Sequence, residues 1–188
     1  IRIQVYFIDN EEYFKKKFIF KGSDGKYFKD NDERSMFFCR GVLETVKKLG
    51  WMPDIVHCHG WMTALMPVYL KSVYKNDPHF SNAKIIYAHY KQDEKLKFSK
   101  DLPTKLDFDE LPTGDLNLDG LADVNKLHEI GIQWSDAVSH GSPEVDETLL
   151  ELIKKTDKSV LEYHDEEQTV EAHQNFYDKV LSENGVLV

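Results

Sequence analysis

The sequence is poor in cysteine, in long apolar runs and in basic charge, and each shortage narrows what the protein can be. Its two cysteines, Cys39 and Cys58, fall on an expected helix face and in an expected buried strand, where a thiol behaves as a small apolar group and a reducing compartment suits it. No apolar run is long enough to cross a membrane, and the start does not resemble a signal peptide. We therefore expect a soluble, cytoplasmic protein that does not bind membranes.

The charge balance and the glycine pattern exclude further classes of protein. Acidic residues outnumber basic ones by 33 to 24 for a net charge of −9, and no basic stripe is interleaved with aromatic residues, so we expect no nucleic-acid partner. The chain has no GxGxxG motif and no phosphate-binding loop. It also lacks an initiating methionine and opens at Ile1 in an expected strand. We therefore expect a domain that is truncated at its start.

What the chain has is an ordinary globular composition and a regular alternation of strands and helices. With 188 residues, 41% of them hydrophobic, it is long enough for one domain, residues 1–188, with a substantial core. Strand patterns cover residues 3–8, 54–58, 84–88, 137–139 and 159–162, and helix patterns cover 31–49, 62–73, 124–134, 145–153 and 166–181. Such alternation implies parallel pairing with right-handed crossovers. We predict an α/β fold with a doubly wound, mostly parallel, Rossmann-like sheet.

Other segments interrupt or extend this alternation. Residues 22–25 resemble the turn of a hairpin, and residues 91–120 are rich in Lys, Asp and Pro with little periodicity. We predict a long loop there, either a lid or a disordered insertion. Residues 159–188 are expected to form a C-terminal strand and tail helix. Asn31 is expected to cap the first long helix, which Gly50 ends, and Arg34 to join a surface ion pair.

The strongest site candidate is the segment 53–61, a short apolar strand that ends in polar residues and turns at once into a helix. The carboxyl ends of parallel strands form the ligand crevice of such sheets. Side chains alternate along a strand, so His57 and His59 point to one face and Cys58 to the other. Trp61 follows at the turn. For His57 alone, we favour the alternative that its ring makes a structural hydrogen bond beneath the following helix and does not belong to the site.

His89 ends the next strand, and we expect it beside His59 across the crevice. Neutral imidazoles there can bond sugar hydroxyls or phosphates, or transfer protons. The alternative is a solvated histidine at the start of a loop. Two histidines on one strand could also begin a metal site, as in a metal-dependent hydrolase, but no further ligand stands at a recognisable spacing, and we predict no metal.

Several motifs occur along the chain in the order that one protein family shows. They are YFID at 6–9, DNDER at 30–34, PDIVHCHGW at 53–61, IIYAH at 85–89, WSDAV at 134–138 and SPEV at 142–145. On these residues the chain resembles the N-terminal (starch synthase catalytic) domain of bacterial glycogen and starch synthases over most of residues 1–155, and short single-domain glycogen synthase-like proteins of Bacteroides-type bacteria most of all.

The resemblance implies a function. Family members transfer glucose from ADP-glucose to the end of an α-1,4-glucan in a cleft between two Rossmann-like domains, and they require no metal or other cofactor. It therefore implies a glucan or a nucleotide sugar as partner, and His57, His59, Trp61 and His89 as substrate-binding residues. Neither the family's Lys-x-Gly-Gly loop nor its second, nucleotide-binding domain is present. We assign no catalytic residue.

The chain also departs from the family within the matching motifs. Gly60, Met62 and Tyr90 stand where the family has Asp, His and Asn. Losing these polar groups would weaken binding of the transition state. Because the second domain and the Lys-x-Gly-Gly loop are missing, we expect a glycogen or starch synthase-like domain that is inactive alone. The alternative, which the changes at these three positions favour, is a catalytically dead domain that binds glucan or another protein. A sheet edge left exposed by a missing leading unit would favour a homodimer or a separate partner domain.

Overall fold

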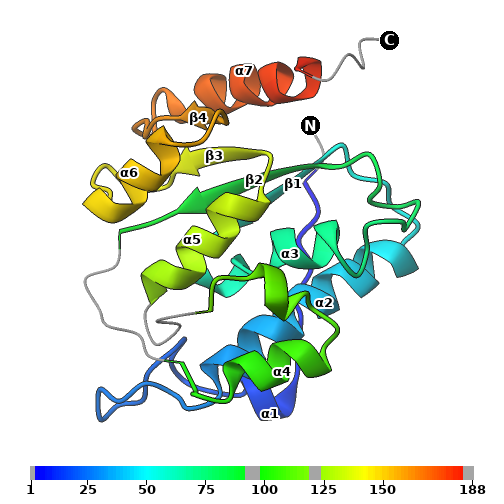
Figure 1. Ribbon diagram of the computed structural model, residues 1–188, viewed down its shortest axis with the longest axis vertical. Coiled ribbons are helices and arrows are strands. Elements are labelled where there is room, and N and C mark those ends of the chain that lie inside the picture. The colour runs from blue at the N-terminus through cyan, green and yellow to red at the C-terminus, as the bar shows by residue number, and fades with distance from the viewer. Residues whose placement is uncertain (1–2, 92–97, 119–123, 184–188) are drawn as a thin grey trace.

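The computed structural model describes residues 3–91, 98–118 and 124–183. The elements in order are α1 (Glu11–Phe14), α2 (Asn31–Lys48), β1 (Ile55–His59), η1 (Trp61–Thr63), α3 (Met66–Lys71), β2 (Lys84–His89), α4 (Leu102–Phe108), η2 (Thr113–Asp115), α5 (Val124–Trp134), β3 (Ala137–His140), α6 (Glu147–Lys154), β4 (Ser159–Leu161) and α7 (Thr169–Ser182). In Figure 1 the sheet lies between α7 on one side and α2, α3 and α5 on the other. No helix in the described ranges is long and apolar enough to span a membrane.

The four strands are parallel and lie in chain order, β1-β2-β3-β4. Right-handed crossovers that all advance in one direction place their helices on one face of the sheet. Accordingly α3, α5 and α6 pack in sequence on that face, and α7 returns over the other face after β4 (Figure 1). The predicted α/β, parallel, Rossmann-like architecture is confirmed.

Side-chain alternation along the strands divides the core between the two faces. Cys58, Tyr87 and Val138 point into the main core with the residues of α2, α3 and α5, whereas Ile86 and Ala137 belong to a smaller core under α7. Burial raises the pKa of the Cys58 thiol well above its ordinary value. Both cysteines are free and buried, as predicted for small apolar groups.

The predicted opening strand is wrong. The side chains of Ile3 and Phe7 are 82% and 89% exposed, and residues 3–9 have no backbone hydrogen bond to another strand. An apolar alternation forms a strand only where a neighbour pairs with its backbone groups. The hairpin prediction is confirmed, because Lys21 pairs antiparallel with Tyr27 around Gly25, whose φ is +74°.

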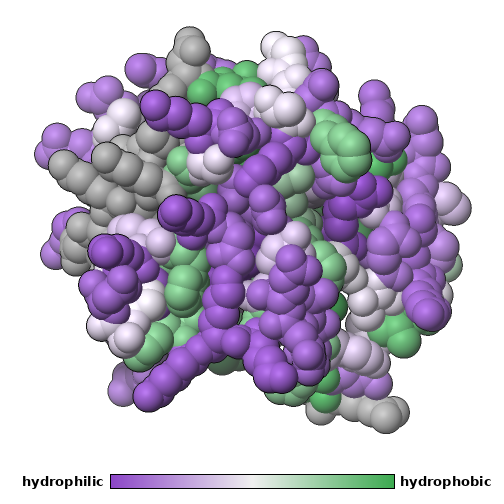
Figure 2. All heavy atoms as spheres, turned by 90° about the horizontal axis from the view of Figure 1, so that it is seen from below, coloured by the Kyte–Doolittle hydropathy of each residue, from purple (hydrophilic) through white to green (hydrophobic). Residues whose placement is uncertain are grey.

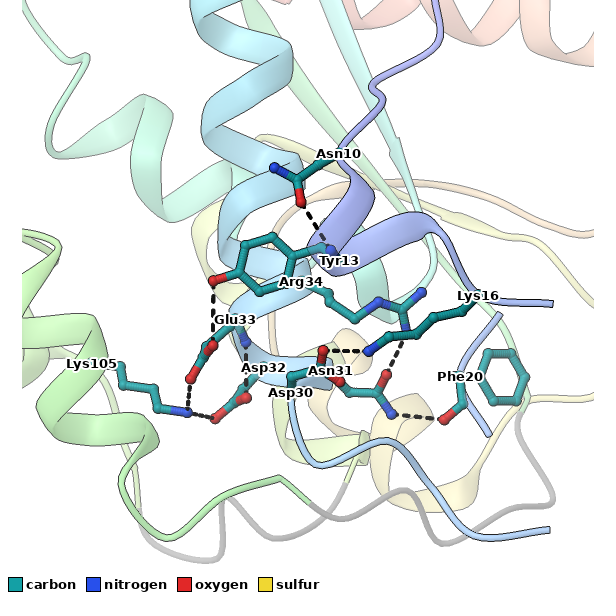
Figure 3. Close-up of polar contacts among 10 residues, drawn as sticks. All are labelled: Asn10, Tyr13, Lys16, Phe20, Asp30, Asn31, Asp32, Glu33, Arg34 and Lys105. Atoms are coloured by element: carbon teal, nitrogen blue, oxygen red, sulfur yellow. Dashed lines mark hydrogen bonds and ion pairs between the residues drawn. The ribbon is translucent and has the colours of Figure 1, made fainter. Parts of the chain in front are cut away.

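The start of α2 is a buried cluster of hydrogen-bonded polar side chains rather than an exposed cap, and we call this cluster the hub. The Asn31 amide donates to the carbonyl oxygen of Phe20 at 2.9 Å, and Arg34 donates to the Asn31 side-chain oxygen at 2.7 Å (Figure 3). Asn31 and Arg34 are 1% and 3% exposed, and Asp30 occupies the cap position instead. The predicted cap and surface ion pair are therefore wrong. The hub ties the preceding hairpin to the helix.

The long-loop prediction is wrong for the part of 91–120 that the structure describes. Residues 98–118 contain α4 and η2, and four leucines are buried there. Leu102 and Leu106 stand four apart on one face of α4 and anchor it to the core, and Leu111 and Leu116 follow. The remaining residues, 92–97 and 119–120, lie outside the described ranges.

The C-terminal helix is held to the sheet by packing and by a histidine. Phe176 and Val180 of α7 are buried against the sheet. His57 Nδ1 and the Tyr177 hydroxyl are 2.8 Å apart, and His57 Nε2 is 3.0 Å from Ser139 Oγ. Burial is the largest cause that lowers the pKa of His57 to about 3, and the neighbouring His59 and His173 add to this effect.

Close packing of α5 on β2 generates a first prediction. A Cβ at Gly131 would lie 2.7 Å from the ring of Tyr87, whose hydroxyl is 2.7 Å from His128 Nδ1 and cannot readily move. We expect Gly131→Ala to lower the free energy of unfolding by about 1–3 kcal/mol, measured by urea denaturation. Gly114→Ala, where a Cβ meets open space, is the matched control. Equal stability of both variants would contradict the packing argument.

Burial of neutral His57 generates a second prediction, on pH. An unfolded chain protonates this histidine near its ordinary pKa of about 6.5, whereas the folded chain does so only near 3. The unfolded state therefore binds more protons in this interval, and stability falls as the pH drops from about 6.5 towards 3. We expect His57→Gln to flatten the pH dependence of the unfolding free energy by up to about 1.4 kcal/mol per pH unit.

Tyr177→Phe is the control for this measurement. It removes one hydrogen bond, worth about 1 kcal/mol, but leaves the titrating imidazole of His57 beneath the same ring. We expect this variant to be less stable at every pH and to keep the wild-type slope. A wild-type slope in His57→Gln as well would show that another group carries the acid sensitivity.

Candidate functional site

The parallel register sets which side chains meet at the carboxyl edge of the sheet. His59 pairs in register with Ala88, and His89 pairs with His140. His89 is therefore one residue beyond the partner of His59, and successive side chains point to opposite faces. The edge consequently holds one group of imidazoles on the α7 face and another on the α5 face.

His57 and His59 lie on the α7 face, as predicted, with ring centroids 4.2 Å apart. His59 Nδ1 is 2.9 Å from the hydroxyl of Tyr90. Burial, and next the positive charge that His173 can carry, lowers the pKa of His59. His57 makes a structural hydrogen bond, which is the favoured alternative for this residue. The bond lies beneath α7, however, and not beneath the helix that follows β1. His57 is therefore a structural residue in this fold.

His89 does not lie beside His59, and this prediction is wrong. Its ring is 4.8 Å from that of His140 and 6.4 Å from that of His128, on the α5 face. The side chain is fully buried, so the alternative of a solvated loop histidine is wrong as well. Burial is the largest cause that lowers its pKa to about 3, followed by His140 and His128. His89 is therefore a neutral, interior imidazole.

Trp61 is also absent from the crevice. Its side chain is 4% exposed and packs against the rings of Phe20 and Phe98, at centroid distances of 6.2 and 5.7 Å. Gly60, with φ +71°, reverses the chain and turns the indole inward. In this structure Trp61 is part of the apolar core.

The residue that occupies the crevice is Tyr90, which directly follows β2. Its hydroxyl meets His59, and its ring covers Gly60 and Gly141, where added Cβ atoms would lie 3.8 and 2.3 Å from it. Only a glycine at position 141 leaves room for the ring. The sequence marks Tyr90 as a departure from the family, but it does not show that Gly141 provides the space.

The imidazoles at this edge are not arranged as a metal centre. In the described ranges no group of three or more His, Cys, Asp or Glu side chains could hold a metal ion. Both ring nitrogens of His57 already face hydroxyl groups, and one nitrogen of His59 faces Tyr90. The contacts of these imidazoles in the described ranges are hydrogen bonds and ring packing.

A second candidate site is a hollow of about 630 Å³ between α1, α2 and α4. Three aromatic side chains line it, Tyr13, Phe37 and Phe108, and Met36 adds apolar surface between them. Figure 2 shows this side of the molecule, where hydrophobic side chains lie between many hydrophilic ones. Phe108 is 90% exposed. The sequence does not reveal this site, because α4 falls within the predicted loop.

Two ionic contacts fix the walls of this hollow, which we call the α2–α4 hollow. At one end Lys105 bonds Asp32 at 2.9 Å and Glu33 at 2.7 Å (Figure 3). At the other end Asp109 accepts hydrogen bonds from Arg40 and from the Tyr69 hydroxyl. Because both bridges join α2 or α3 to the α4 region, the aromatic lining is held in place before any ligand binds.

Comparison with known proteins finds relatives that are glycogen synthases. Glycogen synthase of Chlorobium limicola is 46% identical over 86 residues, covering 45% of this chain and 18% of the relative. Glycogen synthase of Thermotoga maritima is 36% identical over 143 residues, covering 75% of this chain and 28% of the relative. The chain thus spans less than a third of the length of these relatives.

A solved structure and a family match complete the comparison. The catalytic domain of starch synthase IV from Arabidopsis thaliana, bound to ADP and acarbose, superposes with a TM-score of 0.51 at 20% identity, covering 82% of this chain and 30% of the other. That likeness supports the fold. Residues 1–161 match the starch synthase catalytic domain. The chain therefore belongs to the starch synthase catalytic domain family and is a glycogen or starch synthase-like domain.

Proposed function

We propose that this domain binds α-glucan and does not transfer glucose by itself. The observation that carries the proposal is the Tyr90 ring, which fills the crevice at the strand ends and is bonded to His59. A nucleotide sugar needs that space, and its transition state needs preorganised polar groups around it. Gly60, Met62 and Tyr90 stand where the family has polar residues. The crevice therefore supplies neither the space nor the polar groups.

The α2–α4 hollow is the better place for a glucan. Sugar rings present flat C–H faces that pack on aromatic side chains, and hydroxyls that bond to polar groups at the rim. Tyr13, Phe37 and Phe108 offer the faces, and Asp101 and Thr104 line the same hollow. Its volume of about 630 Å³ suits a short stretch of chain rather than a single small ion.

A second function is favoured by the family match itself. As part of a larger enzyme, the domain would contribute to ADP-glucose-dependent transfer to an α-1,4-glucan once Tyr90 is displaced. The sheet edge at β1 and the exposed side chains of Ile3, Val5 and Phe7 support a partner on that side, either a second copy or a separate domain. Light scattering of the purified chain distinguishes these two.

The same resemblance suggests which bacterial relatives the chain is akin to and where in the cell it works. We infer that the chain is akin to glycogen synthase-like proteins of Bacteroides-type bacteria, and that it works in the cytoplasm. The motifs at 30–34 and 53–61, with their substitutions, support the first inference, and the free, buried Cys39 and Cys58 support the second.

The glucan prediction is tested at Phe108, because its exposed ring can be removed without disturbing the core. We expect isothermal titration to detect maltoheptaose binding to the wild-type chain and Phe108→Ala to weaken it about tenfold, the equivalent of losing one stacked ring at about 1.4 kcal/mol. Phe18→Ala, at another exposed ring, should keep wild-type affinity. No binding to the wild type, or equal losses in both variants, would refute the proposed site.

The closed crevice is tested with ADP-glucose. We expect Tyr90→Ala, which removes the ring while Gly60 and Gly141 keep the space open, to gain an ADP-glucose site that the wild type lacks, and the further substitution His59→Ala to abolish that added site. Gly141→Ala is not suitable, because its Cβ would strike Tyr90 and destabilise the fold. Binding of ADP-glucose to the wild-type chain that His59→Ala weakens would overturn the claim that the crevice is closed and favour the transferase.

A further inference from the structure

A third hollow lies at the opposite end of the sheet from the crevice, where β2 begins. It has a volume of about 630 Å³. Its wall is built by Lys71 at the end of α3, by residues 81–85 at the start of β2, and by Trp134 and Asp136 between α5 and β3. None of these residues takes part in the crevice or in the α2–α4 hollow.

This hollow is basic although the whole chain carries a net charge of −9. Lys71, Lys75 and Lys84 line it, and Asp136 is the one carboxylate among its lining residues. Asp136 is already engaged: it lies 2.5 Å from Lys71 Nζ and accepts the backbone N–H of Ile85 at 2.8 Å. For Lys75 and Lys84 the described part of the chain provides no carboxylate within ion-pair distance. Two positive charges therefore face the hollow without neutralisation.

A fourth lysine supports the same electrostatic picture. Lys158 Nζ donates to the carbonyl oxygens of Ile132 and Gln133, at 2.5 and 2.7 Å, at the end of α5. Burial is the main cause that lowers the pKa of Lys158 to about 8, because it disfavours the charged ammonium group, and the nearby positive charge of Lys71 disfavours it further.

The remaining lining adds shape and hydrogen-bond donors. Phe80, Ile85 and Trp134 provide apolar surface, and Ser81 and Asn82 provide polar groups beside the lysines. An anion gains most where fixed positive charge lies in a concave, partly apolar wall. An aromatic side chain next to lysines also suits a flat ring attached to that anion.

We propose that this hollow binds a phosphate-bearing small molecule with a flat ring, its phosphates held by Lys75 and Lys84 and its ring packed against Trp134. The ligand class is that of nucleoside phosphates. The site is remote from the crevice, at the amino ends of the strands, so occupancy here does not compete with a ligand at His59. The proposal is independent of whether the domain binds glucan.

Trp134 makes the binding measurable. We expect tryptophan fluorescence of the full chain to change saturably on titration with ADP at constant ionic strength, with inorganic pyrophosphate binding more weakly because it lacks the ring. Lys75→Gln/Lys84→Gln should weaken ADP binding at least tenfold. Lys48→Gln/Lys100→Gln, at two exposed lysines on other elements, is matched in charge and should bind as the wild type does.

Trp134→Phe locates the signal. This variant should lose most of the fluorescence change while ADP still raises its melting temperature. Equal affinity for ADP and pyrophosphate would overturn the proposed ring contact. The site itself would be overturned by the absence of saturable binding, or by equal weakening in the two double-lysine variants. A circular dichroism spectrum of each variant confirms that lost binding is not lost folding.

Discussion

The whole arrangement depends on four parallel strands paired in chain order. That register makes His89 the neighbour of His140 rather than of His59, and side-chain alternation then sends the two imidazole groups to opposite faces. One group is packed under α7, where His57 bonds Tyr177. The other is packed under α5. Because pairing in register also decides which side chains face α5 and which face α7, moving a strand by one residue would send its side chains to the opposite faces.

At the carboxyl edge of this sheet, one aromatic ring lies over the ends of the strands. Tyr90 occupies the strand ends, and Gly141 gives it room. A family scaffold is preserved in its core and in its strand-to-helix turn, yet the polar groups that a sugar would need are replaced. Function is carried by a site and not by a fold, so membership of the family leaves open where ligands bind. Two hollows lie outside the crevice, one lined by aromatic side chains and one by lysines.

Much of the fold could be predicted from local patterns. The strand at 55–59 and the helix at 124–134 match their patterns closely, because each buries an apolar side that its own spacing reveals. The opening strand failed because an alternating pattern does not supply a partner for the backbone. The helix α4 was missed because a short element with only Leu102 and Leu106 on its buried face carries too weak a period beside so many charged residues.

The sequence by itself determined the fold class, the family and the facing of His57 and His59 on one side of β1, because these depend on residue types and on spacings within a few residues. The tertiary structure alone decided that Trp61 turns into the core, that Asn31 and Arg34 are buried, and that Tyr90 fills the crevice. Those outcomes depend on contacts between segments far apart in the chain, such as position 90 with position 141. Crossover handedness and strand register determine these contacts, and local spacing does not encode them.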